Sequence, residues 1–292
     1  MKKQELIWMN GTLLPGSRVN IPFLTHGLHY GSAVFEGIRV YNGQIYQLEE
    51  HIERLFVSCV LMDMKIPFTK ENMMHACKQV VEVQGLMDGY IRPLVWRGGN
   101  TVKICAPDIK IETAIAAWYV PSSLLSLEEF LNRQPITLTI SRWKRPSPES
   151  APIAAKASGL YVIATLAAHE ARAAGFADAL MLDYRGYLAE ASSSNLFIII
   201  DGKLHTPLAD CFLDGITRQT VMKLSKIEDI PVIERHIFPE ELHKAQEVFL
   251  TGTACEILPV SSIDNKKYQI GSITKTIMKK FYYLVQNQTK IS

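Results

Sequence analysis

The sequence lacks any long hydrophobic run. No apolar stretch reaches the ~18 consecutive residues that a membrane-spanning helix needs. The N-terminal stretch MKKQELIWMNG has two lysines but no apolar run long enough for a signal peptide. Basic residues are not massed either, because the 292 residues carry a net charge of +2 with lysine and arginine scattered along the chain. We therefore expect no membrane insertion and no binding to nucleic acid or to a membrane surface.

Cysteine is also sparse. Its five copies are far apart and form no CxxC pair, and most stand beside apolar residues: Cys59, Cys77, Cys105, Cys211 and Cys255. This pattern predicts reduced core thiols in a cytoplasmic protein. The nucleotide-binding fingerprints GxGxxG and GxxxxGK[ST] and the serine nucleophile elbow GxSxG are missing as well. The hydrophobic content of 48% and the charged content of 21% are typical of a globular protein with a real core.

The order of predicted elements indicates an α/β protein of two domains. Hairpin signals occur at Asn10-Gly11 and Asn42-Gly43, and a strand is predicted through FEGIR with Glu36 on the side opposite Phe35 and Gly37. Two amphipathic helices and two strands follow as far as Val120, and the second helix is capped by Thr69 and ends at Gly85. Ser126 is expected to cap the short helix that comes next. We expect a small N-terminal α/β domain over residues 1–120 and an interdomain linker with a short helix over 121–135. The larger C-terminal domain is expected over 136–292, with strands and helices that alternate. A helix is predicted for the PEELHKA segment of this domain.

One lysine, Lys156, stands in an unusual setting, the stretch APIAAKASGLY. Its neighbours are alanines and a serine, and none of them offers an acidic partner. Desolvation disfavours a charged amine and lowers its pKa, as a lysine that reacts with a carbonyl compound requires. A surface lysine in an alanine-rich loop is the alternative reading of this stretch alone.

Together with Lys156, three further signals favour one cofactor, pyridoxal phosphate. This cofactor needs a lysine, an acid at its pyridine nitrogen and a phosphate-binding site. Glu190 ends a predicted strand and enters a turn of small residues. Gly215, Ile216 and Thr217 begin a predicted helix whose first amides suit a phosphate. The TGT turn at 251–253 offers a hydroxyl and further amides. Each signal is weak alone, since a strand end or a helix start explains it equally well.

Several blocks occur together and in order: HYGSAVFEGIR, HIERL, YIRPL, AAKASG.Y, the Glu190 turn, NLF, LDGITR and TGTACEI. In these blocks the chain resembles the class IV (fold type IV) pyridoxal-phosphate aminotransferases, most closely the branched-chain amino acid aminotransferases. The resemblance covers nearly the whole chain. It implies a C-terminal pseudo-barrel domain that holds pyridoxal phosphate. It also implies at least a homodimer, with small amino acids and 2-oxo acids as substrates.

The resemblance also implies residue roles. Lys156 would form the internal aldimine and move the proton in a ping-pong exchange between leucine, isoleucine or valine and 2-oxoglutarate. The expected cofactor-binding residues are Arg54, Lys156, Tyr161, Glu190, Ser194, Asn195, Leu213, Gly215, Ile216, Thr217 and Thr253. The expected substrate-binding residues are Phe35, Gly37, Tyr90, Arg92, Thr253 and Ala254, with Tyr30 reaching in from a partner subunit. No metal is expected.

The chain departs from the family pattern near the expected site, where Lys103, Ala191, Ser193 and Ser194 replace more usual residues. We expect these departures to change the preferred substrate rather than the transamination reaction itself. A D-amino acid aminotransferase and an aminodeoxychorismate lyase share the fold and remain alternatives, as does an α/β protein without a cofactor. The FEGIR and YIRPL blocks favour the L-amino acid enzyme. Arg92 and the apolar strand around Phe35 favour a small aliphatic substrate over the lyase substrate.

Overall fold

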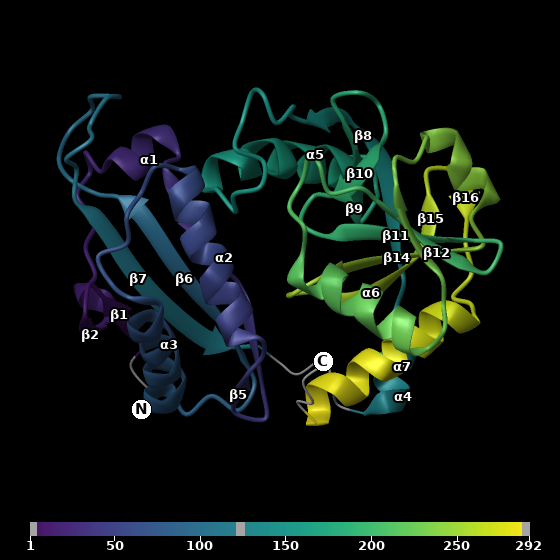
Figure 1. The fold of residues 1–292 in the computed structure, drawn as a ribbon, viewed down its shortest axis with the longest axis horizontal. Coiled ribbons are helices and arrows are strands. Elements are labelled where there is room, and N and C mark those ends of the chain that lie inside the picture. The colour runs from purple at the N-terminus through teal and green to yellow at the C-terminus, as the bar shows by residue number, and fades with distance from the viewer. Residues whose placement is uncertain (1–4, 121–125, 288–292) are drawn as a thin grey trace. The chain divides into compact units, whose positions relative to one another are not determined.

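The computed structural model describes residues 5–120 and 126–287. The chain divides into two compact units (Figure 1): unit 1 is Met1–Ser122 with Ala155–Leu160, and unit 2 is Ser123–Ala154 with Tyr161–Ser292. This division differs from the expected one, because residues 155–160 belong to unit 1. The short helix expected in the linker is α4 (Leu127–Leu131), which belongs to unit 2. The linker residues 121–125 lie outside the described residues.

Unit 1 is built on a seven-stranded sheet in the order β2-β1-β7-β6-β4-β5, with β3 also paired to β6. Its elements are β1 (Leu6–Met9), β2 (Thr12–Pro15), α1 (His26–Tyr30), β3 (Ala33–Phe35), β4 (Ile38–Tyr41), β5 (Gln44–Ile45), α2 (Leu48–Leu61), α3 (Lys70–Gln84), β6 (Gly89–Arg97) and β7 (Ile111–Tyr119). Both predicted hairpin turns are confirmed. The asparagines at 10 and 42 have φ of 49°, which suits a tight turn.

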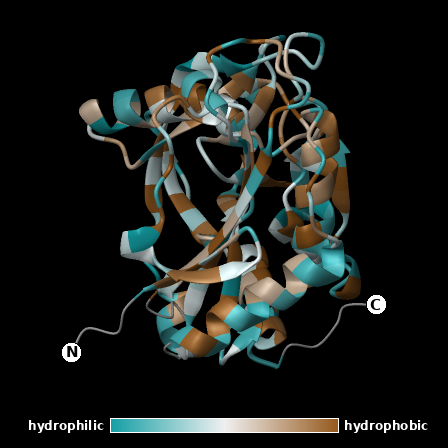
Figure 2. Ribbon diagram, turned by 90° about the vertical axis from the view of Figure 1, so that its left-hand side faces the viewer, coloured by the Kyte–Doolittle hydropathy of each residue, from teal (hydrophilic) through white to brown (hydrophobic). Residues whose placement is uncertain are grey.

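Helices α2 and α3 lie along the sheet of unit 1 (Figure 1) and share one apolar core with it. Ile52 and Leu55 of α2 and Cys77 of α3 pack there with Val34 and Ile91 of the strands. The side chain of Thr69 caps α3 and Gly85 ends it in the left-handed conformation, as the sequence predicts. Figure 2 shows hydrophobic and hydrophilic residues interspersed along the helices, as expected for helices with one buried side.

The strand predicted through FEGIR is interrupted at Glu36 and Gly37, between β3 and β4. Both pieces keep the same register on β6, with Phe35 opposite Leu94 and Ile38 opposite Ile91. Pro93 lies opposite Glu36, and its carbonyl accepts from the Glu36 amide over 2.9 Å. Proline has no N–H to donate in return, so this pair makes one ladder hydrogen bond instead of two. The side chain of Glu36 is thereby placed on the helix-covered face, which is the side predicted for it.

Unit 2 is built on a nine-stranded sheet in the order β10-β9-β8-β15-β14-β11-β12-β13, with β16 paired to β15. Its strands are β8 (Ile136–Arg145), β9 (Asp178–Asp183), β10 (Leu188–Ala191), β11 (Asn195–Ile200), β12 (Lys203–Pro207), β13 (Val232–Arg235), β14 (Glu247–Gly252), β15 (Glu256–Ile263) and β16 (Lys266–Lys267). Because β10 also pairs with β11, the sheet closes on itself in the manner of a barrel.

The longer helices of unit 2 are α5 (Tyr161–Ala173), α6 (Ile216–Ile227) and α7 (Ser272–Asn287). The helix expected for PEELHKA is instead the short 3-10 helix η3 (Pro239–Lys244). It is only six residues long, and short helical segments commonly adopt the tighter 3-10 turn. In the described part of the chain, no helix is both long and apolar enough to cross a membrane.

The cysteines follow the expected pattern with one correction. All five are unpaired thiols, and Cys59, Cys77 and Cys211 are buried. Cys105 is exposed and therefore is not a core thiol. It lies in the connection between β6 and β7, outside the helices and strands.

Candidate active site

Lys156 is held in unit 1 by β3 and α2. Its amide donates to Ser58 Oγ over 3.0 Å, and its carbonyl accepts from the Phe35 amide over 3.1 Å. Ala157 forms an isolated antiparallel bridge with Val34. Lys156 Nζ lies 4.9 Å from the centroid of the Phe35 ring. The backbone on both sides of the lysine is thus fixed, and the amine reaches this aromatic ring.

The alanines around Lys156 differ in exposure. Ala155 and Ala157 are buried, whereas Ala154 is exposed and Lys156 itself is half-buried. The dry setting that the sequence predicts is present at the two flanking alanines and absent at Ala154.

Four expected substrate residues meet on the face of the unit 1 sheet opposite the helices. The Arg92 guanidinium lies 4.6 Å from the ring centroid of Phe35 and 5.5 Å from that of Tyr90. A Cβ on Gly37 would come within 1.7 Å of Tyr90 Oη, so only glycine leaves room for this hydroxyl. Arg92 Nε is buried and has no hydrogen-bond partner in the described structure. Such a donor suits a carboxylate ligand.

Arg39 was assigned no role from the sequence. It lies opposite Tyr90 across β4 and β6 and stacks on Tyr41 at 5.1 Å. Its Nε and Nη2 atoms are buried without a hydrogen-bond partner among the described residues. A second buried guanidinium therefore stands beside the expected substrate residues. The signal in the sequence was an arginine on the same strand face as Phe35 and Gly37.

Arg54, the expected phosphate ligand of α2, forms a fork with a buried carboxylate. Its Nε donates to Glu36 Oε1 over 2.6 Å and its Nη2 donates to Oε2 over 2.9 Å. His51 Nδ1 lies 2.8 Å from the same Oε2. Burial alone would raise the pKa of Glu36, but the charges and hydrogen bonds of Arg54 and His51 outweigh it and hold that pKa well below its usual value. Sequence reasoning missed this buried pair of Glu36 and His51.

Tyr30 ends the short helix α1 at the surface of unit 1. Its hydroxyl donates to the carbonyl of Val102, in the connection that also carries Lys103. The Tyr30 side chain is exposed, and so are Phe23, Leu28 and Ile104 nearby in the chain or in that connection. The structure therefore places Tyr30 at the surface, among several exposed apolar side chains of this part of the chain.

The expected acid, Glu190, lies in the closed sheet of unit 2 and is almost fully buried. Its neighbour across β10 and β11 is Asn195, whose Nδ2 donates to Glu190 Oε2 over 3.2 Å and to the Leu213 carbonyl over 3.0 Å. Arg145 Nε lies 3.3 Å from Glu190 Oε1. Arg145 is buried at the end of β8 and was missed from the sequence, where it appears only as one arginine in a proline-rich loop.

The start of α6 has the features of an anion site. Gly215 is its N-cap, in an extended conformation and without a side-chain cap for the first amides. Ile216 and Thr217 follow and are both buried. A Cβ on Gly215 would come within 2.2 Å of Asn195 Oδ1, so this glycine is required by the side chain that contacts Glu190. The expected acid and the expected phosphate cup thus belong to one packed group.

Three further expected cofactor residues belong to unit 2: Ser194, Thr253 and Tyr161. Ser194 precedes Asn195 and its Oγ lies 3.3 Å from Cys255 Sγ. Thr253 and Ala254 form the turn between β14 and β15, where Thr253 is half-buried and Ala254 is exposed. Tyr161 begins α5 and is half-buried.

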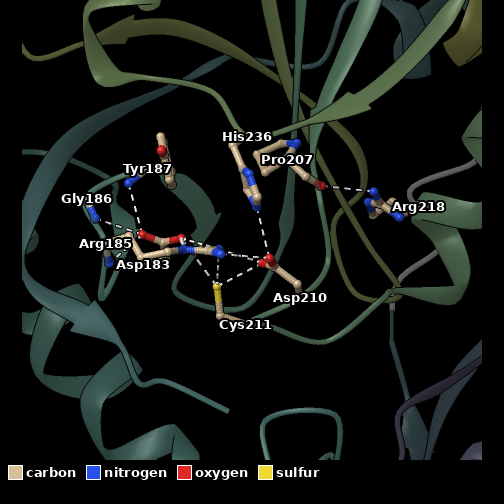
Figure 3. Close-up of polar contacts among 9 residues, drawn as sticks. All are labelled: Asp183, Arg185, Gly186, Tyr187, Pro207, Asp210, Cys211, Arg218 and His236. Carbon is tan, nitrogen blue, oxygen red and sulfur yellow. Dashed lines mark hydrogen bonds and ion pairs between the residues drawn. The ribbon is translucent and has the colours of Figure 1, made fainter. Parts of the chain in front are cut away.

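A polar network anchors the segment that leads to Leu213 (Figure 3). Arg185 donates through Nη1 and Nη2 to both oxygens of Asp210, over 2.9 and 2.8 Å, and through Nε to Asp183 over 2.8 Å. His236 Nε2 lies 2.9 Å from Asp210 Oδ2. These contacts raise the pKa of Arg185 and lower that of Asp210, although burial opposes ionisation of the carboxylate. The turn after β9 and the segment after β12 are therefore joined.

The residues present fit pyridoxal phosphate. Unit 2 offers a buried carboxylate, an uncapped helix start and the buried Thr251 hydroxyl, which lacks a hydrogen-bond partner in the described structure. Unit 1 offers the amine of Lys156, beside an aromatic ring and a buried guanidinium. These are the donor types that the cofactor requires.

Comparisons with known proteins support the same cofactor. The family model for class IV amino-transferases matches residues 33–263. A probable branched-chain-amino-acid aminotransferase of Rickettsia felis is 40% identical over 263 residues, which cover 89% of this chain and 88% of that protein. The structure of the T.th. branched-chain amino acid aminotransferase with pyridoxamine 5'-phosphate superposes with a TM-score of 0.93 at 37% identity, covering 98% of this chain and 96% of that one. The same enzyme complexed with 4-methylvaleric acid or with N-(5'-phosphopyridoxyl)-L-glutamate gives 0.91 at 36% identity.

The two-unit α/β architecture, with the closed sheet of unit 2, defines an enzyme of fold type IV. The chain belongs to the class IV aminotransferases, which use pyridoxal phosphate.

Proposed function

We propose that this protein transfers the amino group of leucine, isoleucine or valine to 2-oxoglutarate in a ping-pong exchange. The observation that carries the proposal is the meeting of Lys156 Nζ and the Arg92 guanidinium at the Phe35 ring, 4.9 and 4.6 Å from its centroid. An amine that can move a proton and a cation that can bind a carboxylate are what an amino acid substrate requires.

In this proposal, the cofactor is held mainly by unit 2. The amides of Ile216 and Thr217 and the hydroxyl of Thr253 would bind its phosphate, and Glu190 would accept a hydrogen bond from its pyridine nitrogen. When bound, pyridoxal phosphate supplies an electron sink for the charge that develops at the substrate Cα. Lys156 would take the proton from that carbon and deliver it to the aldehyde carbon of the cofactor, and Tyr161 would hydrogen-bond the phenolic oxygen.

The substrate side chain would lie against Phe35 and Gly37, with Tyr90 and Arg92 at the carboxylate. A branched aliphatic group suits this apolar ring. Two ligands of the T.th. enzyme support the pair of substrates. 4-Methylvaleric acid has the carbon skeleton of leucine. A phosphopyridoxyl derivative of L-glutamate contains the amino acid that 2-oxoglutarate would become.

We further propose a homodimer in a reducing, cytoplasmic setting. A second subunit would cover the exposed apolar side chains of Phe23, Leu28, Tyr30 and Ile104. Tyr30 would then complete the neighbouring site. The five unpaired thiols support a reducing compartment. Light scattering of the protein eluted from a size-exclusion column measures the oligomeric state. A monomer at micromolar concentration would contradict the dimer.

The test of the function is a substrate panel on the purified holoenzyme. L-leucine, L-isoleucine and L-valine should each yield a 2-oxo acid with 2-oxoglutarate as acceptor. Lys156→Ala with added cofactor should lower the rate at least about a thousandfold, as loss of a proton-transferring nucleophile does. Lys144→Ala, at an exposed lysine of β8, is the matched control and should leave it unchanged. Turnover of D-leucine alone, or an undiminished rate in Lys156→Ala, would refute the proposal.

A further inference from the structure

We propose that Glu36 and His51 are positioning residues that fix the guanidinium of Arg54 for the cofactor phosphate. The inference rests on the phosphate role expected for Arg54 and assigns its support to two buried residues of unit 1. It predicts that a change at Glu36 acts on the phosphate group of the ligand and leaves recognition of the rest of the ligand intact.

The first reason is that both oxygens of the Glu36 carboxylate accept hydrogen bonds. Oε1 accepts from Arg54 Nε, and Oε2 accepts from Arg54 Nη2, from His51 Nδ1 and from the Gly37 amide at 3.2 Å. The side chain of Glu36 is fully buried, and four donors from three residues determine its position. A carboxylate so held has one orientation to offer to a guanidinium.

The second reason is the position of Arg54 at the edge of the core. Its side chain is 15% exposed while its partner carboxylate is 0% exposed, so the arginine has access to the outside of the core that the acid lacks. An arginine side chain has many rotamers, and the fork to Glu36 removes that freedom before a ligand arrives. Binding then loses less conformational entropy, which increases affinity without a new contact.

The third reason is the shared framework of Arg54 and Lys156. His51 and Arg54 are three residues apart on α2 and therefore lie on the same side of that helix. Ser58, one turn further along, accepts from the Lys156 amide. Glu36 follows Phe35, whose amide donates to the Lys156 carbonyl. The same two elements thus hold both the guanidinium and the reactive amine.

An opposing effect has to be weighed. An ionised Glu36 cancels part of the charge of Arg54, so removing the carboxylate could strengthen the attraction of Arg54 for a phosphate. Glutamine is isosteric, but its amide nitrogen cannot accept from Arg54 or His51. Glu36→Gln therefore breaks the fork, and its effect on ligand affinity shows whether geometry or charge dominates.

The experiment compares pyridoxal phosphate with pyridoxal, which carries the same aldehyde but no phosphate. Dissociation constants are measured by equilibrium dialysis against the apoprotein for the wild type, Glu36→Gln, Arg54→Met and the double variant. Reaction of the aldehyde with Lys156 is common to both ligands and cancels in the ratio of the two constants. Glu241→Gln is the matched control, since Glu241 forms a fork of 2.9 and 2.8 Å with Arg235 away from the expected site.

We expect Glu36→Gln to weaken binding of pyridoxal phosphate about tenfold to a hundredfold, the range for a charge-assisted hydrogen bond. Binding of pyridoxal should change less than about twofold, since the perturbation acts at the phosphate. The double variant should match Arg54→Met, because Glu36 acts through that arginine. Glu241→Gln should leave both constants unchanged.

Three results would overturn the proposal: tighter or unchanged binding of pyridoxal phosphate in Glu36→Gln, an equal loss for both ligands, or an additive loss in the double variant. If Arg54→Met binds pyridoxal phosphate normally, the expected role of Arg54 fails instead. A wild type that binds neither ligand would refute the proposed function. If Glu36→Gln does not fold, His51→Gln should show the same selective loss at smaller size, about threefold to tenfold. If His51→Gln weakens binding of both ligands equally, or of neither, that result would also count against the proposal.

Discussion

Replacing Gly215 with alanine should damage both the stability of unit 2 and its affinity for the cofactor. The backbone at Gly215 has φ of −70° and ψ of 139°, which any residue adopts, so the substitution causes no backbone strain. The cost is steric, because the new Cβ would lie 2.2 Å from Asn195 Oδ1 and 3.4 Å from Asn195 Cγ. Asn195 must therefore move.

The magnitude follows from what Asn195 holds. Its Nδ2 donates to Glu190 Oε2 and to the Leu213 carbonyl, and a shift large enough to admit the methyl group breaks or lengthens both bonds. Overpacking costs about 1–3 kcal/mol, and the lost hydrogen bonds add about 1–2 kcal/mol. We expect the free energy of unfolding to fall by about 2–5 kcal/mol and the cofactor to bind more weakly.

Urea denaturation followed by circular dichroism measures the first effect, and cofactor titration measures the second. Gly16→Ala is the matched control, since its Cβ would meet its nearest atom at an ordinary 3.5 Å and should cost less than about 0.5 kcal/mol. In the background of Asn195→Ala the clash is absent, so Gly215→Ala should cost much less there. A full cost in that background would refute the steric explanation, as would a cost equal to that of Gly16→Ala.

Three further predictions concern other parts of the chain. Burial holds the pKa of His51 below its usual value of 6.5, so the unfolded chain takes up a proton there that the folded chain does not, and stability falls as the pH drops below 6.5. His51→Gln should therefore flatten the urea-derived stability profile between pH 7 and 5.5 by up to about 1.4 kcal/mol per pH unit, and an unchanged slope would contradict this. Gly37→Ala should displace the ring of Tyr90 and raise the KM for the amino acid more than it raises the dissociation constant of the cofactor. Steady-state kinetics and cofactor titration measure these two quantities, and a larger rise in the dissociation constant would contradict the prediction. Arg185→Met should lower the free energy of unfolding by about 1–3 kcal/mol by releasing Asp210, and no change in the urea midpoint would exclude this anchoring role.

Features fixed by neighbouring residues were predicted correctly from the sequence. The Asn10-Gly11 turn forms because both residues adopt positive φ, 49° and 93°. The caps of α3 at Thr69 and of α4 at Ser126 are confirmed, since each hydroxyl accepts an amide three residues ahead. These are short-range preferences, and a local pattern contains all the information they need.

Features that depend on distant pairings were missed. The parallel pairing of β8 with β15 joins residues more than a hundred positions apart, so no local pattern indicated how the sheet closes. The assignment of residues 155–160 to unit 1 depends on the contacts of Lys156 and Ala157 with Phe35 and Val34. The charged partners Arg145 and His51 were missed for the same reason, because each meets its carboxylate only in the folded chain.

The two buried carboxylates of the expected site differ in a way that assigns them different roles. Glu36 is 0% exposed, and donors within unit 1 engage both of its oxygens at 2.6–3.2 Å. Glu190 is 8% exposed, and the Nε of its neighbour Arg145 lies at 3.3 Å without forming a hydrogen bond. The carboxylate of Glu190 is held by the amide of Asn195 and lies beside the cation of Arg145. Glu36 is therefore suited to hold a side chain, and Glu190 is suited to accept a hydrogen bond from the N–H of a pyridinium ring.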